Sequence, residues 1–323
     1  MGRLISEKYA AWQAECEERF QQLKKNEEEL NRIFIDIYGL QDELTPDVAD
    51  KDVTVHRVFD SKDDVPESMK GSNYVRTMRD EIVSLISYAV GCMFGRYSLD
   101  VDGLAYAGGE WDTSKYKTFL PDEDNCIPVT DEEYFKDDIV GRFVGFVRTV
   151  YGSDTLEENL DFVANALAGK GSTSREVIRN YFLNDFIKDH IKTYQKRPIY
   201  WMFDSGKQNG FKALVYMHRW NADTTGNVRV EYLHRVQRVY ESEIARMQDT
   251  IDNSSNAREV SAAQKRKDKL TKQLKESKDY DAKIAHLALS RIDIDLDDGV
   301  KVNYEKVQTG QDGKKIEILA PIK

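Results

Sequence analysis

The stretch from Arg197 to Met217, RPIYWMFDSGKQNGFKALVYM, decides the fold, because the hydrophobic period changes there from helical to strand-like. Aromatic and β-branched runs at its two ends flank a polar segment, Asp204 to Gly210. Gly206 and the Asn-Gly pair at 209–210 are residues that favour tight turns. The stretch therefore predicts a β-hairpin over residues 198–217 with a polar tip.

On the N-terminal side of this hairpin, the sequence predicts helices. Residues from about Leu4 to Tyr38 contain no Pro or Gly and predict one long helix, which Gly39 ends. The segment from Tyr74 to Tyr97 is apolar on nearly all sides, with Leu85 among its apolar residues, and so predicts a buried helix. Further helices are predicted at residues 132–151, 156–167 and 175–195, and a short strand at 53–59.

On the C-terminal side, residues 228–291 contain no Gly or Pro. Two helical stretches meet there at residues 252–256, which predicts a long antiparallel helical hairpin. The tail from Val300 to Ile322 alternates around Gly310 and Gly313 and predicts a small C-terminal β-hairpin.

Together these elements predict an α+β, predominantly helical fold with a long N-terminal helix and buried central helices. Its 323 residues are enough for one large domain or two ordinary ones. We expect four segments, which are an N-terminal connecting helix (1–40), a mainly helical core domain with the β-hairpin (41–227), the helical hairpin (228–291) and a C-terminal β segment (292–323).

The composition excludes several classes of protein. Hydrophobic residues make up 40%, yet no run approaches the roughly 18 apolar residues that a membrane-spanning helix needs. Wholly disordered chains and integral membrane proteins are therefore excluded. The three cysteines are odd in number and far apart, which fits free thiols better than a disulfide framework or a zinc site. We expect a cytoplasmic protein without a structural metal.

Charge is unevenly distributed along the chain. The net charge of −10 disfavours a protein whose whole surface coats DNA. Residues 110–138 contain ten acids and three lysines, whereas residues 258–278 contain eight bases and three acids. A locally basic surface is therefore compatible with the negative net charge of the chain.

Motifs that would identify an enzyme are missing. No P-loop, dinucleotide-binding glycine pattern or nucleophile-elbow motif occurs in the sequence. The acidic run at residues 293–298 could hold a divalent cation, but alternating carboxylates also keep an exposed strand edge soluble. We favour the strand edge, and so expect neither a metal site nor a catalytic residue.

Basic, amide and aromatic side chains crowd the predicted β-hairpin and its exit. Such a ribbon can enter a DNA groove, because amides read base edges and aromatics stack on bases. The alternative is that strand residues such as Tyr200, Phe203 and Tyr216 form a core face while the tip is solvated, and spacing alone favours this alternative. The candidate DNA-binding residues here are Arg197, Lys207, Gln208, Asn209, Lys212 and Arg219.

A second candidate surface lies on the helical hairpin and contains Arg266, Lys269 and Lys272. Regularly spaced bases on a helix can neutralise DNA phosphates. A solvated coiled-coil face has the same pattern, so the sequence leaves both interpretations open.

Five separated blocks of sequence carry a resemblance to a known family. They are Asn26–Gln41, Leu85–Tyr97, Leu104–Gly109, Arg197–Phe211 and Asp297–Tyr304. Together they resemble the C-terminal part of the PglX-type adenine-specific DNA methyltransferases of bacteriophage-exclusion (BREX) defence systems, which are related to type IIG restriction–modification methylases. The similarity extends from about residue 20 to the end of the chain.

The resemblance assigns no catalytic or cofactor-binding residue to this chain. The family's catalytic loop reads Asn, Asp or Ser, then Pro-Pro, then Tyr or Phe, and it holds a flipped adenine. All six prolines here are isolated, and the family's glycine-rich loop for S-adenosylmethionine is missing too. We therefore expect no cofactor in this chain, and expect S-adenosylmethionine to bind the methylase domain of the parent protein.

The resemblance implies a noncatalytic DNA-recognition and scaffold portion of an N6-adenine DNA methyltransferase from phage defence or restriction–modification. Its expected partners are double-stranded DNA, the methylase domain of the same protein and other defence-system subunits, with no membrane contact. The alternative function is a protein-interaction scaffold, in which the long helical hairpin docks the methylase domain or other subunits.

Overall fold

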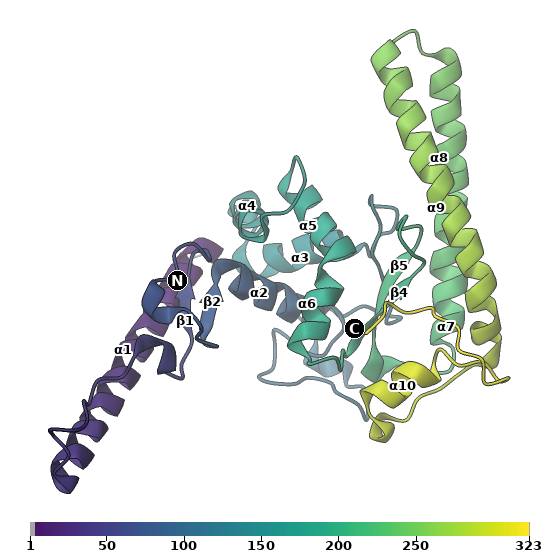
Figure 1. The fold of residues 1–323 in the computed structure, drawn as a ribbon. Coiled ribbons are helices and arrows are strands. Elements are labelled where there is room, and N and C mark those ends of the chain that lie inside the picture. Colours follow the sequence, from purple (N-terminus) through teal and green to yellow (C-terminus); the bar gives the residue numbers. More distant parts are fainter. Residues whose placement is uncertain (1–3, 323) are drawn as a thin grey trace. The chain divides into compact units, whose positions relative to one another are not determined.

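The structure, a computed structural model, describes residues Leu4–Ile322 and is predominantly helical with small sheets (Figure 1). This confirms the predicted α+β class. Residues 1–3 and 323 of the predicted terminal segments lie outside the described range. The helices are α1 (Ile5–Tyr38), α2 (Met78–Met93), α3 (Ile139–Tyr151), α4 (Leu156–Leu167), α5 (Ser174–Asn184), α6 (Phe186–Thr193), α7 (Thr224–Asn227), α8 (His234–Asn253), α9 (Ala257–Ser290) and α10 (Val300–Lys306). The strands are β1 (Arg57–Phe59), β2 (Val75–Thr77), β3 (Ile127–Pro128), β4 (Tyr200–Asp204) and β5 (Lys212–Tyr216).

The chain divides into two compact units. Unit 1 contains Met1–Ile86 and Val147–Ala168, and unit 2 contains Ser87–Phe146 and Gly169–Lys323. The four predicted segments stay a prediction. Over Leu4–Ile322, no helix has both the length and the apolar character needed to cross a membrane.

Unit 1 is built on α1. Strands β1 and β2 form a parallel pair, and Arg57 of β1 makes two hydrogen bonds, of 2.6 and 2.9 Å, to the Glu17 carboxylate of α1. Phe20 of α1 is fully buried against Val53 and Met69. Only the last three residues of the strand predicted at 53–59 are in a strand, because Val53 instead packs into this small core.

Unit 2 is centred on the predicted β-hairpin, which the structure confirms. Strands β4 and β5 pair in antiparallel register from Tyr200–Tyr216 to Asp204–Lys212, and β3 joins β5 on its other edge. Both faces of this sheet are buried. Trp201 and Phe203 belong to the same core as the helical hairpin, whereas Tyr200 stacks on Phe94, just past the end of α2, with ring centroids 5.5 Å apart.

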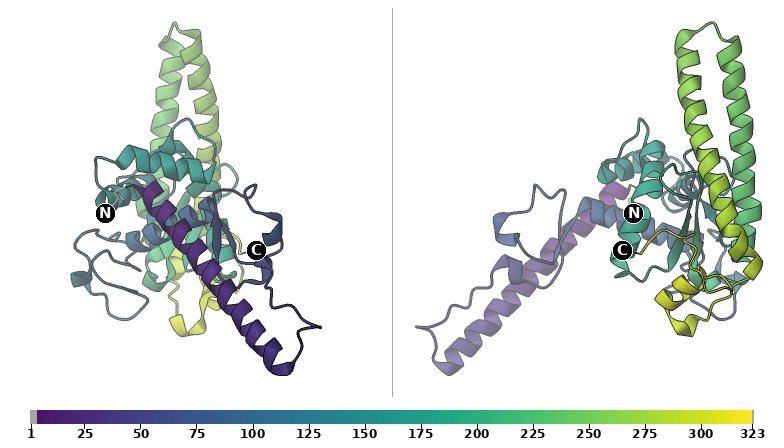
Figure 2. Two further views of the ribbon diagram at one scale, coloured as in Figure 1. Left: turned by 90° about the vertical axis from the view of Figure 1, so that its left-hand side faces the viewer. Right: turned by 45° about the vertical axis from the view of Figure 1, so that its right-hand side comes forward.

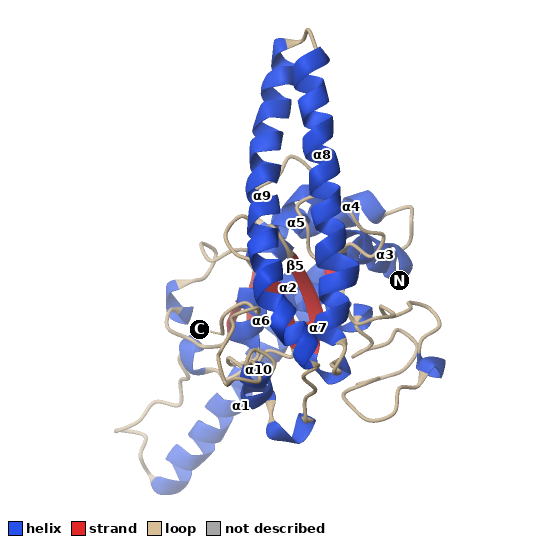
Figure 3. Ribbon diagram, turned by 90° about the vertical axis from the view of Figure 1, so that its right-hand side faces the viewer, coloured by secondary structure: helices blue, strands red, loops and turns tan. Residues whose placement is uncertain are grey.

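The predicted helical hairpin is also confirmed. Helices α8 and α9 lie side by side in unit 2 and are joined at residues 254–256 (Figures 2 and 3). Tyr240 of α8 and Leu270, Tyr280 and Ile284 of α9 are buried in one core. The apolar stripes that predicted the hairpin therefore face each other and the sheet.

Three further elements differ from the sequence-based expectations, and the helix predicted at 132–151 begins only at Ile139. The predicted C-terminal β-hairpin is reduced to one bridge, Thr309–Lys315, because Tyr304 and Val307 are buried at helical spacing and residues 300–306 form α10. The run at 293–298 is not a strand edge but a loop with a short 3₁₀ turn, in which the Asp295 carboxylate accepts a hydrogen bond from the Asp297 amide. The helix predicted at 175–195 is divided at Asp185 into α5 and α6.

The burial of α2 gives a test with a matched control. Ile86 is fully buried, whereas its neighbour Leu85 is only half-buried, unlike the expectation for a helix that is apolar all round. We predict that Ile86→Ala lowers the free energy of unfolding by about 2–5 kcal/mol, since it leaves a cavity, and that Leu85→Ala costs clearly less. Urea denaturation measures both. Equal costs would show that the core lies elsewhere on α2.

Candidate nucleic-acid interface

The tip of the β-hairpin, residues 205–210, is fixed on the middle of α9 by one carboxylate. Glu276 accepts hydrogen bonds from the Ser205 hydroxyl (2.8 Å) and from the backbone amides of Gln208 (2.8 Å) and Gly210 (3.0 Å). An ionised carboxylate is a strong acceptor, and here it satisfies backbone donors of a turn that has few partners of its own. The tip backbone is therefore held on the protein, and only side chains of the tip extend into solvent.

The close approach of the tip to α9 explains why Asn209 and Gly210 occupy the turn. A Cβ atom on Gly210 would lie 2.5 Å from the backbone oxygen of Gln273, so no larger residue fits without displacing the tip from α9. Asn209 has a φ of 54°, in the left-handed region that Asn tolerates, and its carbonyl accepts a hydrogen bond from the Gln273 side chain. The Asn-Gly pair thus serves docking as well as turn formation.

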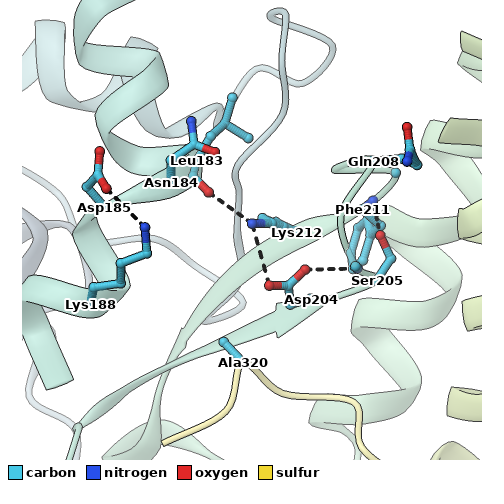
Figure 4. Close-up of polar contacts among 12 residues, drawn as sticks. Leu183, Asn184, Asp185, Lys188, Asp204, Ser205, Gln208, Phe211, Lys212 and Ala320 are labelled. Carbon is cyan, nitrogen blue, oxygen red and sulfur yellow. Dashed lines mark hydrogen bonds and ion pairs between the residues drawn. The ribbon is translucent and has the colours of Figure 1, made fainter. Parts of the chain in front are cut away.

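The candidate residues of the β-hairpin lie in different environments. Lys207 and Gln208 are exposed at the tip, and Asn209 is half-buried. Lys212 is only 8% exposed, and its ammonium donates to the Leu183 carbonyl at 2.9 Å and lies 3.5 Å from an Asp204 carboxylate oxygen (Figure 4). Because this charge is bound inside the protein, Lys212 is not part of the candidate interface.

Arg197 and Arg219 lie at the open end of the β-hairpin, away from the tip. Each strand has five residues, so the two ends are roughly 17 Å apart at about 3.3 Å per residue. Arg197 is exposed. Arg219 donates to the carbonyls of Asp122 (2.7 Å) and Glu123 (2.9 Å) and covers the Trp111 ring at 4.4 Å. These contacts give Arg219 a structural role, which is to fasten the loop that precedes β3.

The three candidate bases of α9 are not equivalent. Arg266 pairs with Asp131 and Glu132, both at 2.9 Å, and Lys269 pairs with Asp131 at 2.5 Å. Burial would raise the pKa of Asp131, but the hydrogen bonds from Lys269 and Arg266 outweigh it, so the pKa is lowered. Lys272 is exposed, and none of the carboxylates that the structure describes pairs with it.

Lys272 lies one turn before Glu276 and therefore on the side of α9 where the tip docks. Lys265 and Lys269 precede it at spacings of seven and three residues, so the three lysines share one side of the helix, which we call the lysine face of α9. All three are exposed. Lys265 was not among the sequence candidates, although its helical spacing from Lys272 is a signal that could have identified it.

The acidic stretch 110–138 is partly neutralised by the fold. Asp138 is fully buried and receives two hydrogen bonds from Arg179, at 2.7 and 2.8 Å. Burial, together with a hydrogen bond to Asp124, raises the pKa of Asp122 well above its ordinary value, which favours the neutral form of this carboxyl. The local excess of acids therefore overstates the negative charge that this region presents.

The Glu276 contacts predict how the tip responds to mutation. Glu276→Ala leaves the backbone amides of Gln208 and Gly210 without their acceptor. We therefore expect these two amides to exchange hydrogen at least about 10-fold faster, which corresponds to a decrease of about 1.4 kcal/mol in the free energy of local opening. Hydrogen exchange by NMR measures each amide. Lys275→Ala, a change to the adjacent exposed residue, is the control and should leave both rates unchanged. Unchanged rates in Glu276→Ala would mean that the carboxylate does not hold the tip.

Two known proteins are similar to this chain in sequence. No protein-family model matches the chain. The adenine-specific methyltransferase PglX of Lacticaseibacillus casei (strain Zhang) is 48% identical over 318 residues, which cover 98% of the chain. The adenine-specific methyltransferase BrxX of Escherichia coli O9:H4 (strain HS) is 38% identical over 316 residues, which cover 94% of it.

The chain spans about a quarter of the length of these curated relatives, 24% of PglX and 26% of BrxX. The two matches cover nearly the whole chain and confirm the resemblance that the five sequence blocks carry. By sequence, the chain corresponds to a C-terminal part of a PglX-type methyltransferase of BREX systems.

Proposed function

We propose that this chain is the noncatalytic C-terminal portion of an N6-adenine DNA methyltransferase and that it contacts double-stranded DNA. The observation that carries the proposal is the fixed position of the hairpin tip, which puts the exposed Lys207 and Gln208 beside the lysine face of α9. The names of the two relatives support adenine methylation as the activity of a longer parent protein.

The two parts of this surface have different physical roles in the proposal. Lysines are flexible point charges that neutralise phosphates of any sequence, so Lys265 and Lys272, the unpaired members of the lysine face of α9, supply nonspecific affinity. Gln208 carries an amide that can pair with a base edge in the major groove, so the tip supplies discrimination between sites. Because the backbone of the tip is anchored to a long helix, less backbone entropy is lost when the Gln208 side chain binds.

The chemical step belongs elsewhere in the parent protein. S-adenosylmethionine and the flipped adenine are assigned to the methylase domain, because no residue of this chain matches that family's catalytic or cofactor loop. The chain is assigned to the cytoplasm, in keeping with its three free, buried cysteines.

A scaffold role is the second candidate, and one observation favours it. Several bases of the helical hairpin are already paired with side chains of the same hairpin, such as Lys278 with Glu241 and Arg246 with Glu243. Bases paired in this way add little to phosphate binding, and much of the hairpin surface is then available for protein contacts.

The first prediction of this proposal separates free from paired lysines. Lys272→Glu should weaken binding to every DNA duplex and lower the slope of log affinity against log salt by about 1 or more, because a phosphate contact is lost. Lys278→Glu is the matched control, since Lys278 is exposed on the same helix but pairs with Glu241 at 2.6 Å, and its effect should be smaller. Fluorescence anisotropy with this chain, at several salt concentrations, measures both.

The same assay tests discrimination by the tip. Gln208→Ala should reduce the preference between duplexes by about 1–3 kcal/mol for a lost bidentate contact, with little change in the salt slope. If the unmodified chain shows no salt-dependent affinity for DNA, the DNA-contact role is wrong and the scaffold role remains.

A further prediction concerns the cofactor. Titration calorimetry of this chain with S-adenosylmethionine should show no binding in the micromolar range, whereas the full-length methyltransferase should bind it. Micromolar binding to the chain by itself would contradict the assignment of the cofactor to the methylase domain.

A further inference from the structure

The C-terminal third of α1 carries an uncovered apolar face. Five residues at helical spacing are large, apolar and 45–70% exposed, and Leu44 just beyond the helix is 55% exposed. The five are Leu30, Ile33, Phe34, Ile37 and Tyr38. Isolated exposed apolar residues are ordinary, but a contiguous set of this size marks an interaction surface. We call the five helix residues the α1 apolar face.

The opposite side of the same helix is covered by the chain that follows it. After Gly39 the chain returns alongside α1, where Asn31 donates to the Pro46 carbonyl at 3.1 Å and Glu28 accepts from the Val48 amide at 3.3 Å (Figure 2). Ile35 is buried on that side. At 3.6 residues per turn, Ile33 and Ile37 lie on the far side of the helix from Ile35 and Glu28, so unit 1 leaves the apolar face open.

The charge around the α1 apolar face argues against two possible occupants. Residues 27–44 contain six acids and a single base, Arg32, which pairs with Glu29. DNA phosphates would be repelled by this rim. A second copy of the chain would bring an equally acidic rim against it, which disfavours self-association through this face.

The remaining chain of the parent protein is a more suitable occupant. The relatives are about four times as long as the matched segment, so most of the polypeptide that surrounds this segment lies outside the structure. A covalently linked partner has a high effective concentration, and an apolar surface of moderate size is then enough for stable docking. Its complementary surface should have an apolar centre and a neutral or basic rim.

We propose that the α1 apolar face is the docking surface for the methylase portion of the full-length protein. The inference rests on the proposed place of this chain within a longer methyltransferase. It assigns protein docking to unit 1 and leaves DNA contact to the tip and the lysine face of α9 in unit 2.

Thiol labelling tests the proposal, because the three natural cysteines of the chain are only 1–3% exposed. Ile33→Cys puts a thiol on the apolar face. Gln21→Cys puts the control thiol at an exposed position of α1 about 120° away around the helix. Each variant is made in this chain and in the full-length methyltransferase, and the rate of alkylation by iodoacetamide at that residue is measured by peptide mass spectrometry without DNA.

We expect both thiols to react rapidly in this chain, and only the thiol at position 33 to react at least about 10-fold more slowly in the full-length protein. Equal rates at position 33 in the two proteins would overturn the proposal, as would equal protection of positions 21 and 33. Concentration-dependent protection of position 33 in this chain would identify a second copy as the occupant instead. Since no DNA is present, failure of the DNA-contact role leaves this result unaffected, and the reverse also holds.

Discussion

The organisation of unit 2 depends on the burial of one short β-ribbon on both of its faces. Strands β4 and β5 have no exposed face, so each face needs its own cover, Phe94 and α6 on one side and the α8–α9 hairpin on the other. Because both of its faces are covered, the orientation of the ribbon in unit 2 is fixed, and so is the position of its tip. The tip therefore reaches α9 at Glu276, where a single carboxylate closes the turn.

Sequence reasoning succeeded where the pattern is local and failed where a partner is distant. The β-hairpin and the helical hairpin were predicted because turn residues and apolar periodicity occur within each element. The ion pairs of Arg266 and Lys269 with Asp131 join residues about 135 positions apart, and no local pattern indicates them. Burial of Lys212 could not be predicted either, since alternation along a strand says nothing about a cover on its second face. The alternation in residues 300–307 was misleading because Tyr304 and Val307 fit a helix equally well.

Charge pairing within the fold reduces the contrast between the acidic and basic stretches of the sequence. The strongly acidic and strongly basic stretches meet in space, where Asp131 binds two bases of α9, and Asp138 is compensated by Arg179. On α9, fewer bases are unpaired than the sequence suggests, and the unpaired Lys265 and Lys272 lie on one side of that helix.

The Glu276 contact also has a consequence for the order of folding. Its partners at residues 205–210 precede it by 66 to 71 positions, whereas α8 and α9 are neighbours in sequence. Contacts of low sequence separation form early, because less chain entropy is lost when they close. During synthesis the tip emerges from the ribosome well before α9, so its amides must remain hydrated until the second arm of the helical hairpin has been made. The tip therefore reaches its final hydrogen bonds only after α9 has been made.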